Sequence, residues 1–388
     1  MSEWPEVRLS DVAEITVGFV GTMAKHYRSD GVPFLRSQNV LAHRLDMGDM
    51  RFISHDFDAQ IGKSALAPGD VVTVRTGKPG LTCVVPAWLE HANCSDLVIT
   101  RPSGRLDARW FSYYMNSQAV HSVNASIVGA VQQHFNVGAA KALRINLPPL
   151  PEQQAIAEVL GALDDKIAAN TQLAASLEDY SRALVEQLFV APVQLGDVVT
   201  LDKNQVNPQV LDVALVDEYS LPAYDAGRWP SRVAPSEIKS NKFVISGERV
   251  LLSKLNPRFP RIWVVDRNPT EDVPRLASTE FLVLNALACS PGFLWALLSQ
   301  ADFNRQLASQ AAGTSSSHQR VRPADILAAT IPDPRQVAPE MRDHIDSLRA
   351  AASALRRENR TLAATRDALL PQLMSGKLRV RDLASEGR

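Results

Sequence analysis

The chain of 388 residues repeats an ordered set of motifs about 185 residues apart. The repeated pairs are VRLSDV at 7–12 with VQLGDV at 193–198, PGDVV at 68–72 with SGERV at 246–250, QQHFNV at 132–137 with SSHQRV at 316–321, LPPL at 147–150 with IPDP at 331–334, and LVEQLF at 184–189 with LLPQLM at 369–374. Solenoid repeats have periods of up to about 50 residues, so this spacing indicates a duplicated domain. Two similar domains on helical segments predict a pseudo-twofold molecule that holds two similar objects at a fixed separation.

The periodicity of the chain predicts an α+β fold of five segments. Residues 1–150 and 191–335 are strand-rich, with candidate strands at 71–74, 97–100, 243–245, 249–252 and 262–265. Each of these segments also contains one probable helix, near 108–117 and near 292–299. Long helices are expected at 151–190 and 336–378, and 379–388 forms a tail. The length agrees with two to three domains, each large enough for its own core.

The two helical segments have apolar residues at the spacing of a helix seam, and the second holds a heptad over about 33 residues. A helix of about 38 residues is about 57 Å long. One polar residue lies near the middle of each seam, Asn170 in the first and Asn359 in the second. A polar seam residue costs stability and can set register, so these two residues could define an antiparallel coiled coil. The alternative is that each faces solvent at the edge of the seam.

Composition narrows the class of protein. The N-terminus has no basic and apolar leader, and no run approaches the 18 apolar residues of a membrane span, so a cytoplasmic protein without membrane contact is expected. Cys83, Cys94 and Cys289 lack CxxC spacing, which argues against a disulfide framework or a zinc site. The net charge of −1 neither supports nor excludes DNA binding, although the helical segments 151–190 and 336–388 carry −5 and +3.

Two strings in the helical segments are specific. LPPLPEQQ at 147–154 leads into the first long helix, and RDALLPQLMSGKL at 366–378 closes the second. Both resemble the specificity (S) subunit of type I restriction–modification systems, and the resemblance extends over essentially the whole chain. It implies that 1–150 and 191–335 are target recognition domains, each reading one half of a split, asymmetric DNA sequence. It also implies that the two conserved helices form an antiparallel coiled coil that acts as a ruler between them.

The same resemblance implies the partners. Double-stranded DNA, two adenine-N6 methyltransferase (modification) subunits and probably two restriction subunits would assemble with this chain. S-adenosylmethionine, ATP and Mg²⁺ would be used by those partner subunits, and this chain would bind no cofactor itself.

Candidate DNA contacts lie on polar loops, because Arg pairs bidentately with guanine and Asn or Gln with adenine. In the first domain they are Arg36, Gln38 and Asn39; Arg75, Thr76 and Lys78; and Gln132, Gln133 and His134. In the second domain the corresponding loops hold Lys254, Asn256, Arg258 and Arg261, and then Thr314, Ser315, Ser317, His318, Gln319 and Arg320. A weaker candidate is the segment 224–229. Any one of these residues could instead be an ordinary solvated side chain. Most contacts are expected to reach phosphate, as for Arg75, whereas Gln132 is expected to read a base.

The chain lacks the motifs of an enzyme. No Asn/Asp-Pro-Pro-aromatic segment is present to hold a flipped base, and no glycine-rich cofactor fingerprint follows a strand. The eight histidines show no HExxH or paired metal spacing. Two functions therefore compete: a DNA-recognition adaptor for a methyltransferase, and a non-catalytic protein-interaction scaffold with a coiled-coil spacer. A third, a self-sufficient nuclease or methylase, requires activity from the purified chain alone.

Overall fold

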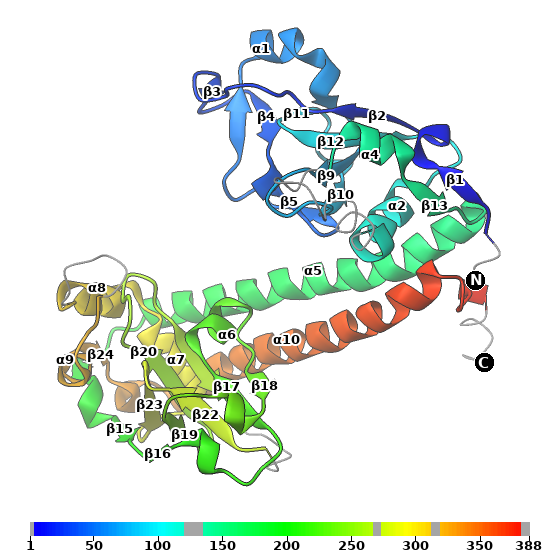
Figure 1. Ribbon diagram of the computed structural model, residues 1–388. Helices are drawn as coiled ribbons and strands as arrows, with labels where there is room; N and C mark the ends of the chain where they lie inside the picture. Colours follow the sequence, from blue (N-terminus) through cyan, green and yellow to red (C-terminus); the bar gives the residue numbers. More distant parts are fainter. Residues whose placement is uncertain (1–3, 120–134, 267–272, 312–318, 382–388) are drawn as a thin grey trace. The chain divides into compact units, whose positions relative to one another are not determined.

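The computed structural model of the chain describes residues 4–119, 135–266, 273–311 and 319–381 (Figure 1). It divides into two compact units, each made of one globular domain and the adjoining parts of two long helices. The first unit comprises residues 1–168 and 359–388, and the second comprises 169–358. The boundaries expected at 150 and 190 lie close to the two ends of the first long helix, α5 (Leu150–Glu186). The second long helix is α10 (Pro339–Met374).

Two sheets form the globular part of the first unit. The four-stranded sheet has the order β10-β9-β12-β2, with β2 (Ala13–Val17), β9 (Val71–Val74), β10 (Thr82–Val84) and β12 (Leu97–Pro102). The five-stranded sheet has the order β3-β7-β4-β11-β8, with β3 (Tyr27–Arg28), β4 (Val32–Leu35), β7 (Arg51–Ile53), β8 (Ala65–Leu66) and β11 (Ala92–Cys94). Shorter pairs are β5 (Val40–Leu41) with β6 (Arg44–Leu45), and β1 (Glu6–Arg8) with β13 (Arg144–Asn146). The helices are α1 (His55–Gln60), α2 (Ala108–Tyr114) and α4 (Val137–Ala142).

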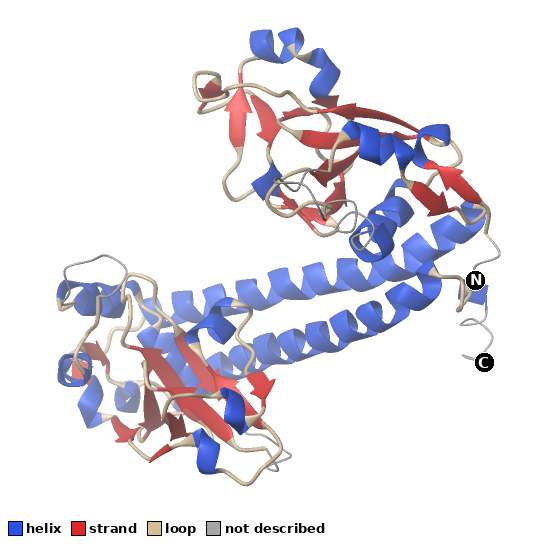
Figure 2. Ribbon diagram, in the orientation of Figure 1, coloured by secondary structure: helices blue, strands red, loops and turns tan. Residues whose placement is uncertain are grey.

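The globular part of the second unit is also built on two sheets (Figure 2). Its four-stranded sheet has the order β15-β23-β20-β21, with β15 (Val199–Asp202), β20 (Arg249–Ser253), β21 (Ile262–Val265) and β23 (Phe281–Ala286). Its five-stranded sheet has the order β16-β19-β22-β17-β18, with β16 (Gln205–Val206), β17 (Val216–Tyr219), β18 (Ser231–Val233), β19 (Lys242–Val244) and β22 (Arg275–Ser278). β14 (Pro192–Gln194) pairs with β24 (Thr330–Pro332). The helices are α6 (Leu221–Asp225), α7 (Pro291–Leu298), α8 (Ala301–Ser309) and α9 (Pro323–Ala328).

The two globular parts share one topology. The strands β2, β12, β9 and β10 correspond in order and direction to β15, β23, β20 and β21. In the other sheet, β7, β4, β11 and β8 correspond to β18, β17, β22 and β19, and each copy has one parallel pair at the equivalent place. Only the edge strands β3 and β16 differ, because they extend opposite ends of the sheet. The duplication read from the motifs is therefore present in the tertiary structure.

One helix in each globular part attaches it to the long helices of its own unit. The carboxylate of Asp107 caps α2 by accepting a hydrogen bond from the Trp110 amide, and Ser290 caps α7 through the Phe293 amide. Trp110 packs in one core with Ile156 of α5. Phe293 packs in the other core, together with Val185 and Ile345 of the long helices. Both helices lie where the sequence places them, whereas the other helices of the globular parts, α1, α4, α6, α8 and α9, were not predicted.

The LPPLPEQQ string has a structural reason in this arrangement. Gln153 is fully buried, and its amide nitrogen donates to the carbonyls of Arg105 at 3.0 Å and Pro148 at 2.9 Å. Its amide oxygen accepts a hydrogen bond from the Asp107 backbone at 2.8 Å. One glutamine therefore satisfies backbone groups at the start of α5 and at the start of α2, which a buried site requires.

The long helices run antiparallel within each unit. In the first unit Asp164 of α5 pairs with Arg366 of α10 at 2.6 Å, and the Ile167 carbonyl accepts from Asn359 at 3.1 Å. In the second unit Asn170 pairs with Glu358 at 3.0 Å and Glu178 pairs with Arg356 at 2.7 Å. In both, position along α5 rises as position along α10 falls. The predicted α+β fold with an antiparallel helix pair is thus confirmed.

Candidate nucleic-acid interface

A hairpin loop in each globular part carries several of the predicted contact residues. Residues 75–81 join β9 to β10 in the first unit, and residues 254–261 join β20 to β21 in the second. Gly77 and Gly80 adopt positive φ angles of 83° and 93°, and Asn256 adopts 51°. Glycine and asparagine are the residues that tolerate this region, which explains why the loops can turn tightly here.

A described residue or segment from later in the chain lies against this hairpin in both units. In the first unit the amide of Phe135 donates to the carbonyl of Arg75 at 3.2 Å. In the second unit the Asn256 amide donates to the Gln319 carbonyl at 2.8 Å, and the Val321 amide donates to the Lys254 carbonyl at 3.1 Å. Segments separated by about 60 residues in each copy are therefore neighbours. We call these two places the hairpin faces: 75–81 with the buried Phe135 behind it, and 254–261 with 319–321.

Carboxylates already pair with three cations of the hairpin faces. Arg75 forms an ion pair with Asp96, Arg261 forms two hydrogen bonds with Asp225 at 2.7 and 2.9 Å, and Arg320 forms two with Glu280 at 3.1 and 2.9 Å. These hydrogen bonds lower the pKa of Asp225 and of Glu280 below their ordinary values and raise the pKa of both arginines. The pairs hold the guanidinium groups in fixed positions and offset their charge.

Asp96 and Glu280 occupy matching places in the two copies. Asp96 lies between β11 and β12, and Glu280 lies between β22 and β23, so each acid stands at the crossover from one sheet to the other. The Lys254 amide also donates to the Glu280 carbonyl at 2.9 Å. The sequence analysis missed these acids as parts of the candidate site. These two acids could have been suspected only by aligning the two copies, because their ion pairs join residues that are far apart in the sequence.

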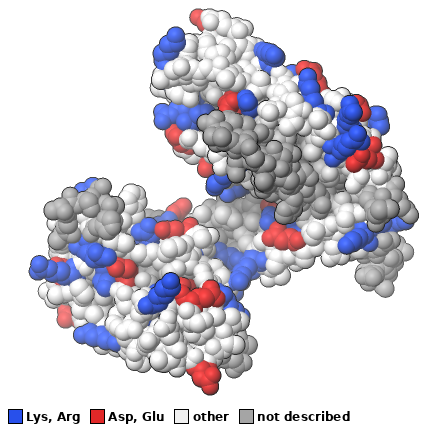
Figure 3. Space-filling view, in the orientation of Figure 1, with Lys and Arg blue, Asp and Glu red and all other residues white. Residues whose placement is uncertain are grey.

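The remaining cations of the hairpin faces are more accessible. Lys78 and Arg258 are exposed, and neither forms an ion pair with any residue that the structure describes. Phe259, next to Arg258, is 70% exposed. In the space-filling view, basic and acidic side chains are interspersed over the surface of both units, in agreement with the paired cations (Figure 3). Electrostatic attraction for DNA would therefore depend on local cations such as these.

In the loop that follows β4, one of the three predicted DNA contacts is buried. Asn39 is only 1% exposed, its amide oxygen accepts from the Arg36 backbone at 3.1 Å, and its amide nitrogen donates to the Asp46 carbonyl at 2.9 Å. An amide that is buried and used in this way cannot reach a base, so Asn39 is a structural residue and its assignment as a DNA contact is corrected. Its neighbours Arg36 and Gln38 both bind the carboxylate of Asp49, at 3.1 and 2.8 Å.

The pairing at Asp49 has two further features. The Arg36 hydrogen bond, more than any other cause, lowers the pKa of Asp49. Arg51, which the sequence analysis did not single out, lies 3.5 Å from Asp49, and its guanidinium lies 5.9 Å from the ring centre of Tyr27. Arg36 lies over the same ring at 6.0 Å. Two arginines around one tyrosine and one carboxylate make this loop a second cationic surface of the first unit.

Several predicted residues fall outside the described ranges. These are Gln132, Gln133, His134, Thr314, Ser315, Ser317 and His318. Thr76 and Lys254 lie on the hairpin loops and are partly exposed. In the weaker candidate segment, Asp225 pairs with Arg261 as described. Arg228 instead pairs with Glu178 of α5.

Other kinds of site were sought in the described part of the chain. It contains no group of three or more His, Cys, Asp or Glu side chains placed to hold a metal ion. None of its helices combines the length and the apolar character that crossing a membrane requires. All three cysteines are free, and burial raises the pKa of Cys83 and of Cys289 to about 12. A thiol with so high a pKa is a poor nucleophile at neutral pH.

Comparison with known proteins gives this geometry a context. Residues 1–179 match the family model of the type I restriction modification DNA specificity domain. The chain is 26% identical over 213 residues to the type I restriction enzyme EcoBI specificity subunit of Escherichia coli, which covers 53% of this chain and 42% of that protein. It is 23% identical over 201 residues to the putative type I restriction enzyme MjaX specificity subunit of Methanocaldococcus jannaschii, covering 49% of this chain and 46% of that protein. The matched stretches thus span less than half the length of these relatives.

A solved structure extends the likeness in fold to the rest of the chain. The crystal structure of the type I restriction–modification system S subunit from M. genitalium superposes with a TM-score of 0.59 and covers 96% of both chains at 13% sequence identity. At that identity the comparison establishes the fold. Residues 1–179 are therefore similar to the type I restriction modification DNA specificity domain, and the chain as a whole has the fold of the M. genitalium S subunit.

Proposed function

We propose that this chain is the DNA-recognition subunit of a type I restriction–modification complex. It would read a bipartite, asymmetric target, one half with each globular part, and would position adenine-N6 methyltransferase subunits on that target. Restriction subunits would join where the host encodes them. The chain would be non-catalytic by itself, and S-adenosylmethionine, ATP and Mg²⁺ would be bound by the partner subunits.

One observation carries this proposal above all: the same topology is built twice, with a polar hairpin loop at the same place in each copy. The loops 75–81 and 254–261 join equivalent strands, and their side chains differ between the copies. Equal geometry with different side chains suits two readers of two different short sequences, since base edges are distinguished by the hydrogen-bonding groups presented to them. Arg320 and Gln319 in the second unit are the described residues best placed for this use.

The helix pair supports a fixed gap between the two half-sites. A continuous helix of 37 residues, such as α5, has a length of about 55 Å, and B-DNA repeats about every 34 Å. Because α5 and α10 each contribute to both units, neither unit can lose contact with the helix pair without losing part of its own core. We therefore expect the spacer in the target to have one length.

The deciding experiment is single-molecule methylome sequencing of cells that express this chain with its cognate modification subunit. N6-methyladenine in one split motif with a fixed gap would support the proposal. Two variants sharpen the test: Gln319→Ala should relax the motif in one half, and Gln38→Ala should relax only the other half. If a stable complex forms with the modification subunit but no new methylated motif is seen, the scaffold function is the better account. Methylation by the purified chain alone would instead indicate an enzyme.

A further inference from the structure

The second unit contains a pocket of about 220 Å³ that belongs to neither hairpin face. Its wall is formed by β17, β21, α7 and the segment 228–232 of the globular part, together with side chains from α5 and α10. All of these residues belong to the second unit. The pocket is half-enclosed, and both charged and apolar side chains form its wall, so it is suited to a small ligand.

Charge distinguishes this pocket from the rest of the protein. Six arginines line it, namely Arg228, Arg232, Arg275, Arg349, Arg356 and Arg357. Among the described residues three carboxylates line it with them, those of Glu178, Asp217 and Asp266, so the described lining has a formal excess of three positive charges. The whole chain has a net charge of −1, so this concentration is local.

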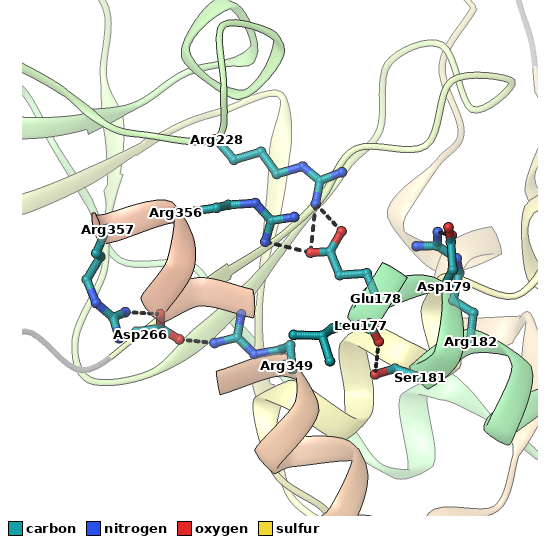
Figure 4. Close-up of polar contacts among 10 residues, drawn as sticks. All are labelled: Leu177, Glu178, Asp179, Ser181, Arg182, Arg228, Asp266, Arg349, Arg356 and Arg357. Carbon is teal, nitrogen blue, oxygen red and sulfur yellow. Dashed lines mark hydrogen bonds and ion pairs between the residues drawn. The ribbon is translucent and has the colours of Figure 1, made fainter. Parts of the chain in front are cut away.

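Two of the carboxylates are each shared by two guanidinium groups (Figure 4). Arg228 donates to both oxygens of the buried Glu178 at 3.1 and 3.0 Å, and Arg356 reaches the same carboxylate at 2.7 Å. Asp266 pairs with Arg349 and, at 3.4 Å, with Arg357. A guanidinium has five N–H donors, so Arg228 and Arg356, which share the Glu178 carboxylate, keep donors for an additional acceptor.

The other two arginines of the pocket wall, Arg232 and Arg275, form hydrogen bonds of their own. Arg232 forms two hydrogen bonds with Asp217, at 2.9 and 3.0 Å. Arg275 is 8% exposed and donates to the backbone carbonyls of Asp266 at 2.9 Å and Gly247 at 3.0 Å. Those carbonyls satisfy its donors without neutralising its charge. Cations removed from water in this way are costly unless an anion compensates them.

We propose that this pocket binds the phosphate group of a small phosphorylated molecule. A phosphomonoester carries about 1.5 to 2 negative charges at neutral pH, which offsets half or more of the excess of three, and it has three acceptor oxygens. The planar fork of arginine matches phosphate geometry in bidentate contacts. A single carboxylate would offset only one charge and is the poorer fit.

The size of the pocket and its aromatic residues narrow the class of ligand further. Drug-sized pockets begin at about 300 Å³, so 220 Å³ holds a phosphate with a small attached group. Trp229, 40% exposed, lies at the pocket with Trp263 and Trp295. A planar group attached to the phosphate can stack on such a ring, so a mononucleotide is the probe of choice. A DNA duplex cannot enter, because its phosphodiesters lie on a wide backbone.

Binding would also join two parts of the second unit. Arg228 and Arg232 come from the globular part, and Arg349 and Arg356 come from α10. A phosphate held by both sets adds bonds across this packing, so it would raise the thermal stability of the unit by mass action. This inference does not depend on DNA reading, and its test is separate from the methylation experiment.

The test is isothermal titration of the full chain with AMP, ribose 5-phosphate and adenosine at constant ionic strength. We expect one saturable site for AMP, weaker binding of ribose 5-phosphate and no binding of adenosine. Arg356→Gln should weaken AMP binding at least tenfold. In this variant Glu178 stays paired with Arg228. Arg305→Gln, at an exposed cation on α8, is the matched control and should leave binding unchanged. AMP should raise the melting temperature of the wild type and not that of Arg356→Gln.

A second variant guards against misfolding as the cause of a loss. Ser353 lines the pocket on α10 and forms none of the ion pairs, so Ser353→Glu adds a carboxylate without removing a contact. It should abolish AMP binding while the protein remains folded by circular dichroism. The proposal is overturned if AMP shows no saturable binding, if adenosine binds as tightly as AMP, or if both pocket variants bind AMP like the wild type.

Discussion

The side-chain amide of Asn170 on α5 donates a hydrogen bond of 3.0 Å to the carboxylate of Glu358 on α10. Asn170 is only 2% exposed, so it does not face solvent at the edge of the seam. Asn359, the other polar seam residue, donates to the carbonyl of Ile167 at 3.1 Å. Each asparagine thus has a partner on the opposite helix, which is what a register-setting residue requires. Their role in setting the register stays a prediction.

Replacing Asn170 by Leu tests that role. Leucine fills the buried seam position and adds apolar burial worth about 1–2 kcal/mol, so the melting temperature should rise. The pairing should also become less specific, since the polar contact that penalises shifted registers is lost. Spin labels at Ala175 and Ala351, both exposed within the second unit, should then give a broader distance distribution. Gln172→Leu, at an exposed position two residues away, is the control. Unchanged stability and an unchanged distribution in Asn170→Leu would show that the asparagine does not set the register.

Glu178 should be a centre of stability in the second unit. Its buried carboxylate is shared by Arg228 and Arg356, so Glu178→Ala leaves two guanidinium groups without their anion. Removing one partner of a buried ion pair costs about 3–5 kcal/mol, and we expect about 3 because both arginines are partly exposed. Urea denaturation of the full chain measures this loss. The adjacent Asp179→Ala removes an exposed carboxylate that pairs only at the surface with Arg182, and it should cost well under 1 kcal/mol. Equal losses in the two variants would contradict the assignment.

Arg75 should contribute to DNA affinity without contributing to sequence preference. Arg75→Ala removes a cation from the hairpin face of the first unit and leaves Asp96 as an unpaired negative charge beside it. Binding to specific and to random duplexes should weaken by a similar factor, and the slope of log affinity against log salt should fall by about 1. Fluorescence anisotropy over a salt series measures both. Arg144→Ala removes an exposed, ion-paired arginine of β13 outside the candidate loops and should leave the slope unchanged. A loss confined to the specific duplex would make Arg75 a base reader.

The half-buried His43 predicts a loss of stability in mild acid. Burial, partly opposed by the charge of Asp164, lowers the pKa of His43 from 6.5 to about 4. Below pH 6.5 the unfolded chain therefore takes up a proton that the folded chain refuses until about pH 4. The free energy of unfolding should fall across that window, by up to roughly 3 kcal/mol from this group.

His43→Asn isolates this contribution. His43 adopts a positive φ of 65°, which asparagine tolerates, and asparagine does not titrate. The difference in unfolding free energy between the wild type and this variant, measured in urea at pH 7 and at pH 5, removes the effect of the other acidic groups. The wild type should lose more stability than the variant between the two pH values. Parallel losses would show that His43 is not the responsible group.

Much of the fold follows from short-range patterns in the sequence. The duplicated motifs mark equivalent strands and turns, since the strings at 7–12 and 193–198 both form a short strand followed by a 3₁₀ helix. The heptads at 336–378 predict α10 because helix periodicity depends on neighbouring residues. The hairpin loops carrying Arg75 and Arg258 were predicted for a similar reason: a loop between two strands is visible in the chain itself.

Only the tertiary structure decided which residues meet and which are buried. Asn39 is a residue type that can read a base, but its side chain is buried and forms hydrogen bonds with backbone groups of its own loop. The pairs Arg261–Asp225 and Arg228–Glu178 join residues 36 and 50 positions apart, and no local pattern encodes such a distance. The arginine-lined pocket likewise gathers side chains from β17, β21, α5, α7 and α10. Periodicity in the sequence determines elements and their duplication, whereas packing of those elements determines the partners of each charged group, because ion pairing depends on position in space and on burial.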